Sequence, residues 1–324
     1  MKRRLSVLLV LATVLAFGQD RPKNYKVQPK EPGEVRIGAW NMKWFPSGSK
    51  DPKPAREENK RLGSAARFLR WQLMDVVMFE EMRSAEVCSN LVKHSAIEGF
   101  RVNACSQFPR QGKFPQHQNA IVSRYDAVDS GWKLFDRSKT APPRGMVWAV
   151  LDIEGTLYGF VAVHLKSNYI PWWAEDEEET AKWNRAKRED STEQLVKFAD
   201  ELLAREYDGR KVAAVFVGGD MNTSRFEEAY KDEKTIPIIM AAGYRDVFED
   251  VPVEQRYTML ETRDYPNSVF DYLFVKGDVA TSKPETTPMQ YTSDHRMIYV
   301  HLANGPSVEP EPLPQDNVAQ VGRP

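Results

Sequence analysis

The sequence predicts an α/β fold in which two packed β-sheets carry helices on their outer faces, within one domain that spans residues 34–303. Three observations predict this class. Strand-like segments outnumber helical ones, hairpins mix with strand–helix–strand units, and the sequence has no internal repeat of fixed length. The composition, with 41% hydrophobic and 28% charged residues, is that of a globular protein and excludes collagen-like or wholly disordered chains.

The predicted strands are short apolar segments, and several of them stop at polar residues. The segments 146–153 and 157–165 flank Glu154-Gly155-Thr156 and therefore predict a hairpin. The strands are expected over residues 35–41, 75–79, 119–123, 146–153, 157–165, 212–217, 269–275 and 297–302.

Two helices are predicted between these strands. Residues 55–74 carry apolar side chains at helical spacing, which indicates an amphipathic helix. Ser191 and Gln194 have the spacing of a capping box, so we expect a second helix to begin there and to end at Gly209.

Both ends of the chain are expected to lie outside the domain. Three cations followed by a short apolar segment and small residues predict a secretory signal peptide over residues 1–18. The alternative is an N-terminal membrane anchor, but the apolar segment is shorter than the roughly 20 residues that a spanning helix needs. Residues 19–33 are predicted to be a linker, and the Pro-rich acidic residues 304–324 a disordered tail. We therefore expect an exported, periplasmic or secreted protein without a stable membrane span.

Charge and cysteine content narrow the function classes. The net charge of −1 excludes a nucleic-acid binder held mainly by a broad basic field. The two cysteines, Cys88 and Cys105, exclude a disulfide-rich scaffold and a four-cysteine zinc site. In an oxidising compartment they could form one disulfide or remain two buried thiols, and the sequence leaves both alternatives open.

Polar residues at the ends of several predicted strands carry the chemistry. Such residues converge when their strands share one edge of a sheet. Carboxylate and amide oxygens suit a hard cation such as Mg²⁺, and histidines beside them suit proton transfer near neutral pH. The set contains Asn41, Glu81, His164, Asp220, Asn222, Asp271, Asp294 and His295. The sequence has no HExxH, GxxxxGK[ST] or GxSxG motif, so zincin, P-loop and serine-hydrolase chemistry have no support.

The order and spacing of these segments resemble the endonuclease/exonuclease/phosphatase superfamily, the metal-dependent fold of deoxyribonuclease I and exonuclease III. The resemblance covers nearly all of residues 34–303, and its most specific segments are Gly219-Asp220-Met221-Asn222 and Ser293-Asp294-His295. The other matching segments are Trp40-Asn41, Phe79-Glu80-Glu81, Asn119-Ala120-Ile121-Val122-Ser123, Val163-His164-Leu165-Lys166-Ser167-Asn168 and Phe270-Asp271-Tyr272-Leu273-Phe274.

The resemblance implies a four-layer α/β sandwich of two facing mixed β-sheets flanked by helices. It also implies a divalent-metal site, most simply for Mg²⁺, with Mn²⁺ or Ca²⁺ as other candidates. Glu81 would hold the metal, with Asn41 and Asp294 nearby. The family's Gln-Glu pair is Glu80-Glu81 here, so the adjacent carboxylate of Glu80 leaves the choice between the two slightly open.

The resemblance further implies roles in catalysis. Asp220 would orient or deprotonate the attacking water, and Asn222 would hold a phosphate oxygen. His295, oriented by Asp294, would face the scissile phosphate. His164 would assist the leaving oxygen, as in the deoxyribonuclease branch, and Asp271 would support that histidine or the water.

Positively charged side chains near the substrate are needed to offset the negative charge of these carboxylates. Arg144 precedes a strand at a position where the family often has a substrate-contacting arginine, and Lys166 follows His164. The alternative for both is a solvated surface cation. Three other histidines, His94, His117 and His301, have no evident partner in the sequence and are expected to be structural or superficial.

Residues 169–183 combine three tryptophans with an acidic run. The segment is expected to be a surface loop pinned by its aromatic side chains. The other interpretation is a loop over the mouth of the site whose tryptophans stack on a base or contact lipid.

The sequence therefore predicts an exported, monomeric, metal-dependent hydrolase of phosphate esters, most simply a nuclease that cleaves phosphodiester bonds of DNA or RNA. One alternative is a phosphatase or phosphodiesterase for a small-molecule or lipid phosphoester, such as a sphingomyelinase-like or inositol-phosphate activity. Another is a non-catalytic binding module, although the complete residue set argues against a decayed site.

Overall fold

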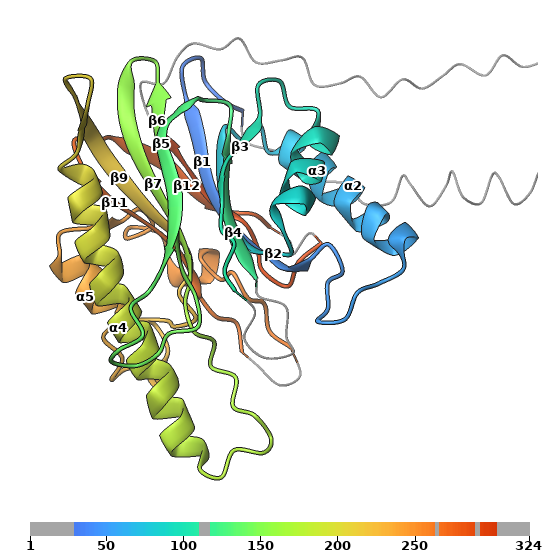
Figure 1. Cartoon of the computed structure of the whole chain (residues 1–324), viewed down its shortest axis with the longest axis vertical. Helices are drawn as coiled ribbons and strands as arrows, with labels where there is room; N and C mark the ends of the chain where they lie inside the picture. The colour runs from blue at the N-terminus through green and yellow to red at the C-terminus, as the bar shows by residue number, and fades with distance from the viewer. Residues whose placement is uncertain (1–28, 110–116, 263–265, 289–291, 303–324) are drawn as a thin grey trace, which may run out of the picture.

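The computed structural model describes residues 29–109, 117–262, 266–288 and 292–302. These residues form two facing mixed β-sheets with helices on both outer faces, so the predicted four-layer α/β sandwich is confirmed (Figure 1). The predicted signal peptide, most of the linker and the C-terminal tail lie outside the described residues. No helix within the described ranges combines the length and the hydropathy needed to cross a bilayer.

The first sheet has six strands in the order β12-β13-β1-β2-β4-β3. Its central pair, β1 and β2, is parallel, and the other neighbours are antiparallel. The strands are β1 (Val35–Phe45), β2 (Val76–Met82), β3 (Arg101–Cys105), β4 (Gln118–Ser123), β12 (Thr281–Thr286) and β13 (Ile298–Leu302).

The second sheet follows the order β10-β11-β9-β7-β6-β5, with the short β8 paired to β9. Here β7 and β9 form the parallel pair, and β6 and β7 form the predicted hairpin. The strands are β5 (Ala127–Leu134), β6 (Gly145–Ile153), β7 (Thr156–His164), β8 (Glu206–Tyr207), β9 (Arg210–Asp220), β10 (Arg245–Asp246) and β11 (Asp271–Gly277).

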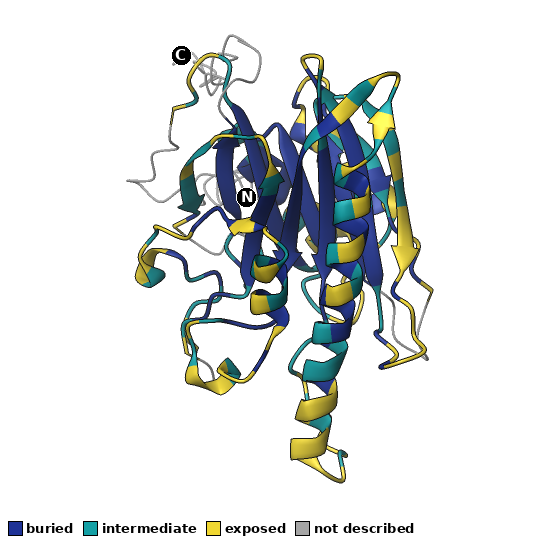
Figure 2. Cartoon of the chain, turned by 90° about the vertical axis from the view of Figure 1, so that its left-hand side faces the viewer, coloured by how far each residue is buried: buried dark blue, intermediate teal, exposed yellow. Residues whose placement is uncertain are grey.

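Helices α2 (Ala55–Trp71) and α3 (Ala85–Ser95) pack on the outer face of the first sheet. Helices α4 (Glu177–Leu203) and α5 (Thr235–Ala241) cover the second sheet, and two short 3₁₀ turns, η1 (Glu228–Tyr230) and η2 (Val253–Gln255), lie in loops. The apolar core between the sheets is fully buried and includes Met78, Phe160 and Phe216 (Figure 2). Each such side chain contributes about 1.5–3 kcal/mol by leaving water.

Helix α4 differs from the prediction. It does not begin at Ser191 but at Glu177, where the Asp176 side chain accepts a hydrogen bond from the Glu179 backbone N–H, and it ends at Leu203. The Ser191 hydroxyl instead donates to the Lys187 carbonyl one turn earlier. Three glutamates in the first turn favour the positive end of the helix dipole, so the acidic run marks the true start of the helix.

The segment 169–183 is consequently part loop and part helix. Its aromatic side chains are not pinned to the body: Trp172 is 87% exposed, and Trp173 and Trp183 are also exposed. The first two turns of α4 extend beyond the sheets and are largely exposed (Figure 2). The expected anchoring of this segment by its tryptophans is therefore wrong. Both cysteines are free thiols in the structure, Cys88 buried and Cys105 partly buried.

Candidate active site

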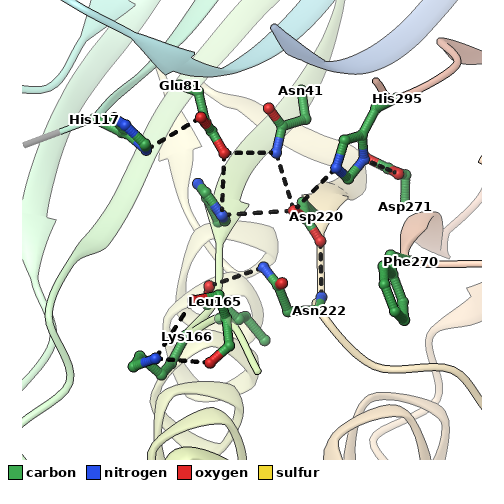
Figure 3. A network of polar contacts seen from close by, with 12 residues as sticks. Asn41, Glu81, His117, Leu165, Lys166, Asp220, Asn222, Phe270, Asp271 and His295 are labelled. Carbon is green, nitrogen blue, oxygen red and sulfur yellow. Dashed lines mark hydrogen bonds and ion pairs between the residues drawn. The ribbon is translucent and has the colours of Figure 1, made fainter. Parts of the chain in front are cut away.

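The polar residues selected from the sequence come together at one end of the sandwich, between the two sheets (Figure 3). The first sheet contributes Asn41 near the end of β1 and Glu81 near the end of β2. The second contributes His164 and Asp220, which are the last residues of the parallel neighbours β7 and β9 and lie opposite each other. The parallel pairs therefore direct four polar side chains to the same edge.

Irregular backbone aims the first two of these side chains. Glu81 has φ +60°, and the register of β2 with β4 shifts between Phe79 and Met82. The neighbouring β1 is irregular as well, with positive φ at Lys43 and Trp44. The Trp44 backbone N–H donates to Glu81 Oε2 at 2.8 Å, so the irregular backbone of β1 orients the Glu81 side chain of β2. Positive φ is uncommon outside glycine and is concentrated at functional sites.

Gly219 sets the position of the next residue, Asp220. A Cβ at Gly219 would lie 2.0 Å from the Val163 carbonyl oxygen and 2.7 Å from Glu80 Oε1, and its φ is +131°. Only glycine permits this close approach of β9 to β7 and to the first sheet. The Gly-Asp pair of the sequence is therefore a backbone requirement as well as a chemical one.

Asp220 is the hub of the site. Its Oδ2 accepts from Asn41 Nδ2 at 3.0 Å and lies 3.5 Å from His164 Nε2 and 3.8 Å from His295 Nε2. Its Oδ1 accepts from the Asn222 backbone N–H at 2.8 Å. Burial raises the pKa of Asp220 to about 7, although the positive charge of His295 opposes this shift. A carboxylate with a pKa near neutrality can act as a base for water.

His295 is held by Asp271, the first residue of β11, whose Oδ2 lies 2.7 Å from His295 Nδ1. Burial alone would lower the pKa of His295, but the carboxylates of Asp271 and Asp220 raise it to about 10. His295 is therefore an imidazolium at neutral pH, with its Nε2 directed toward Asp220.

The expectation that Asp294 orients His295 is wrong. Asp294 is partly exposed and pairs with Lys43 Nζ at 2.8 Å. Of the two roles expected for Asp271, support of His164 is wrong for the same geometric reason, because Asp271 faces His295. The β9–β11 register, which places Asp271 opposite Asp220, explains the difference.

His164 belongs to a second, less charged group of residues. Its Nε2 lies 3.9 Å from Glu81 Oε1, and its ring stacks on that of His117 with 6.0 Å between centroids. Burial and the nearby charge of Arg144 lower the pKa of His164 well below its usual range. It is therefore neutral near pH 7 and a weak proton donor.

His117 is a site residue that the sequence reasoning missed, since it was expected to be structural or superficial. Its Nδ1 lies 3.4 Å from Glu81 Oε2, and burial lowers its pKa to about 4. The donor atoms of Glu81, His117 and His164 all lie within 4.8 Å of one another. The strand pairing places it there: β4 runs antiparallel to β2, so the residue before β4 lies at the edge where β2 ends, and no local sequence signal indicates this pairing.

The two predicted substrate-binding cations lie beside this second group. Arg144 Nη1 donates to the carbonyl oxygens of His164 and Leu165, at 3.0 and 2.8 Å. Lys166 Nζ donates to the Ser167 carbonyl at 2.7 Å. Burial and the charges of Arg144, Lys187 and Arg188 lower the pKa of Lys166 to about 7. Neither is a freely solvated surface cation.

Asn222 is within reach of the site but is engaged by the backbone. Its side-chain amide donates to the Leu165 carbonyl at 3.2 Å, and its φ is +52°. Asn168 Nδ2 in turn donates to the Asn222 carbonyl, which fixes the turn after β9.

Glu80 and Glu81 differ in their burial and in their access to the site. Glu81 faces the site, whereas Glu80 is fully buried and its two carboxyl oxygens have no hydrogen-bond partner among the described residues. Burial, together with the carboxylates of Asp271 and Asp220, raises the pKa of Glu80 well above its usual range. Glu80 is therefore a neutral acid in the position of the family's glutamine, and Glu81 is the glutamate available to a metal.

A cavity of about 930 Å³ adjoins the site on the side of Glu81 and His117. Its wall includes Trp44, Ser84 and Phe108, so it offers apolar, hydroxyl and charged groups together. Cavities of this volume hold small molecules or part of a larger ligand.

The site fits a divalent cation. Glu81 and Asp220 supply oxygen atoms and the two neutral imidazoles supply nitrogen atoms between the sheets (Figure 3). Asn41 directs its Nδ2 to both carboxylates, and its Oδ1 accepts from the Lys43 backbone N–H at 3.0 Å. Asp294, which was expected to lie near the metal, instead pairs with Lys43 Nζ.

Comparisons with known proteins identify the family and the fold of the chain. The sequence model of the Endonuclease/Exonuclease/phosphatase family matches residues 38–295. A search of curated protein sequences finds no match.

Among solved structures, the chain is similar to an endonuclease/exonuclease/phosphatase from Beutenbergia cavernae (TM-score 0.61, 15% identity, 85% of this chain and 72% of that one). It is also similar to the mannosyl-6-phosphatase Bt3783 of Bacteroides thetaiotaomicron (0.59, 14%, 83% and 99%). A third similar structure is truncated TDP2 of Caenorhabditis elegans (0.52, 17%, 83% and 98%).

At these identities the solved structures establish the fold, while the family model covers most of the chain and includes the segments that build the site. The chain belongs to the Endonuclease/Exonuclease/phosphatase family of phosphoester hydrolases.

Proposed function

We propose that this hydrolase is an exported, divalent-metal-dependent phosphodiesterase that cleaves DNA or RNA. The observation that carries the chemistry is the row Asp220–His295–Asp271, in which an imidazolium lies between a carboxylate with a raised pKa and a supporting carboxylate. Hydrolysis of a phosphate ester needs a base for water and a positive group for the phosphoryl oxygens, and the row offers both.

In the proposed reaction each member has one task. Asp220 accepts the proton of the attacking water, and Asn41 keeps the Asp220 carboxylate oriented. As the water oxygen bonds to phosphorus, the bond from phosphorus to the leaving oxygen breaks, and the leaving oxygen takes a proton from solvent water. His295 donates through Nε2 to the nonbridging oxygen on which negative charge develops, while Asp271 keeps Nδ1 protonated. Arg144, beside His164, adds positive charge on the opposite wall.

Glu81 would hold the metal, with the amide of Asn41 adjacent, and Mg²⁺ or Mn²⁺ are the ions we expect to support activity. The bound cation would offset the repulsion between the phosphate and the acidic residues around it.

One observation favours the alternative of a small phosphoester. The cavity of about 930 Å³ beside Glu81 is of the size that encloses a drug-sized molecule. A phosphatase or phosphodiesterase for a small-molecule or lipid ester therefore remains the second candidate.

The deciding experiment is a substrate panel with the purified mature protein. Plasmid DNA, structured RNA, a phosphodiester dinucleotide and a set of phosphomonoesters are compared with Mg²⁺, Mn²⁺ or Ca²⁺ and with EDTA. We expect cleavage of nucleic acid with Mg²⁺ or Mn²⁺ and none in EDTA. Turnover of monoesters alone would replace the nuclease by the second candidate, and full activity in excess chelator would refute the metal requirement.

Export is tested separately. Mass spectrometry of the protein from its native source should show a mature N-terminus near Gln19. An intact Met1 on a protein that remains in the cytoplasm would contradict the proposal.

A further inference from the structure

We propose that Glu81, His117 and His164 form a binding site for a transition-metal ion of the Zn²⁺ or Co²⁺ class. The inference deepens the proposed function and rests on it only for the location of the reaction, because the metal site is defined by the three side chains themselves. The oxygen ligands expected from the sequence predict Mg²⁺, whereas two imidazoles beside one carboxylate favour ions that bind nitrogen.

The distances match a shared ion. Zn–N and Zn–O bonds of about 2.0–2.2 Å place two ligand atoms of one tetrahedral zinc about 3.3–3.6 Å apart. His117 Nδ1 lies 3.4 Å from Glu81 Oε2, and His164 Nε2 lies 3.9 Å from Glu81 Oε1. The three donor atoms lie within 4.8 Å of one another, so a rearrangement of the side chains would bring them to one ion.

Glu81 and His117 are held in place by their surroundings. Glu81 Oε2 accepts from the Trp44 backbone N–H at 2.8 Å, and Oε1 accepts from Asn41 Nδ2 at 3.2 Å. The Trp44 ring meets the His117 ring edge to face at 3.8 Å between centroids. These contacts orient Glu81 and His117, whereas His117 Nε2 and His164 Nδ1 have no hydrogen-bond partner among the described residues.

The site also has an open side. Glu81 and His117 line the cavity of about 930 Å³, so water or a substrate oxygen can complete the coordination there. Catalytic zinc sites have three protein ligands and one open position, in contrast to closed structural sites. In this arrangement His164 is a metal ligand, and this role replaces the proton-donor role inferred from the family resemblance.

The test is Co²⁺ binding to the metal-free mature protein, followed by visible absorption and by competition with Zn²⁺ and with excess Mg²⁺. We expect one equivalent of Co²⁺ with ligand-field bands, displaced by Zn²⁺ and not by a large excess of Mg²⁺. Groups outside the first coordination sphere alone change metal affinity by about 10–100-fold, so His117→Gln or His164→Gln should weaken Co²⁺ binding by about 100-fold or more.

The matched control is His94→Gln. His94 is exposed on α3 and contacts the Asn90 carbonyl, so this variant should bind Co²⁺ as the wild type does. Circular dichroism establishes that each variant is folded. If either site variant does not fold, pulsed EPR of the Mn²⁺-loaded wild type provides the same information, because coordinated imidazole nitrogen produces a measurable coupling.

The outcomes are distinct. Wild-type affinity in the His117→Gln and His164→Gln variants, no Co²⁺ binding by the wild type, or no nitrogen coupling would overturn the inference. Mg²⁺-supported hydrolysis together with any of these results would leave the proposed function intact. Co²⁺ bound by the triad without hydrolysis of any tested ester would overturn the proposed function and leave the metal site standing.

Discussion

The two walls of the site use the same residue type in opposite states. On one wall His295 is flanked by Asp271 and Asp220, and its pKa is raised to about 10. On the other wall His164 and His117 lie beside Glu81, and His164 also lies 3.5 Å from Asp220, but burial and the positive charge of Arg144 lower the pKa of both. Burial is common to all three histidines, so the number and sign of the neighbouring charges decide which imidazole is an acid and which is a ligand.

His295→Ala removes the charged side of this comparison and should have the largest effect. Its interaction is realised mainly in the transition state, so kcat should fall by roughly 10²–10³-fold with little change in folding. Steady-state kinetics on the preferred ester, together with a thermal melt, measures both. Wild-type turnover would mean that the reaction takes place elsewhere.

His164→Ala tests the role of the neutral histidine on the opposite wall of the site. As a metal ligand, His164 should matter equally for an activated nitrophenyl ester and for a natural ester with an alkoxide leaving group, with losses of roughly 10–10²-fold in each. A proton donor to the leaving group would instead be dispensable for the activated ester. The ratio of the two losses therefore separates the roles, and a severe loss confined to the natural ester would restore the proton-donor assignment.

Asp271→Asn should lower the pKa of His295, so that this histidine becomes neutral at a lower pH. The reaction requires ionised Asp220 and protonated His295, so kcat/KM should rise as pH increases through about 7 and fall as pH increases through about 10. Without the carboxylate of Asp271 the pKa of His295 decreases, and the alkaline limb should move to lower pH.

Asp294→Asn is the control for this shift, because Asp294 is paired with Lys43 and raises the pKa of His295 less than Asp271 and Asp220 do. Its alkaline limb should move less. Equal shifts in the two variants would contradict the assignment of Asp271 as the partner of His295.

Glu80→Gln should have the smallest effect, on stability. Because the pKa of Glu80 is raised in the folded state, the unfolded chain loses the proton first as pH rises, and the free energy of unfolding falls above the ordinary glutamate pKa. The amide variant lacks this titration, so it should be more stable than the wild type at pH 8, by on the order of 1 kcal/mol or more, and nearly equal at pH 4.5. Urea unfolding at both pH values measures the difference, and a wild-type advantage at pH 8 would show that Glu80 is ionised.

Much of the fold could be predicted because strand boundaries carry strong local signals. The apolar segments around Val76 and Val215 and the turn at Gly155 mark strands and a hairpin directly. The start of α4 could not be found from Ser191, since a residue typical of helix starts also occurs inside helices, where its hydroxyl bonds the preceding turn.

The membership of the site was predictable, but its pairing was not. Asn41, Glu81, His164, Asp220 and His295 do converge, since they lie at strand ends on one edge. Which carboxylate serves His295 depends on the β9–β11 register, and the presence of His117 depends on the β2–β4 pairing. Neither pairing is encoded in any local segment.

The close contact at Gly219 joins the two halves of the sandwich where their catalytic groups meet. Because each sheet supplies only part of the constellation, neither sheet can be active alone, and any opening that slides one past the other separates base from acid. Catalytic turnover therefore reports whether the two sheets are correctly aligned. Because the packed core holds the two sheets in register until the domain unfolds, loss of activity during heating should coincide with cooperative unfolding and should not precede it.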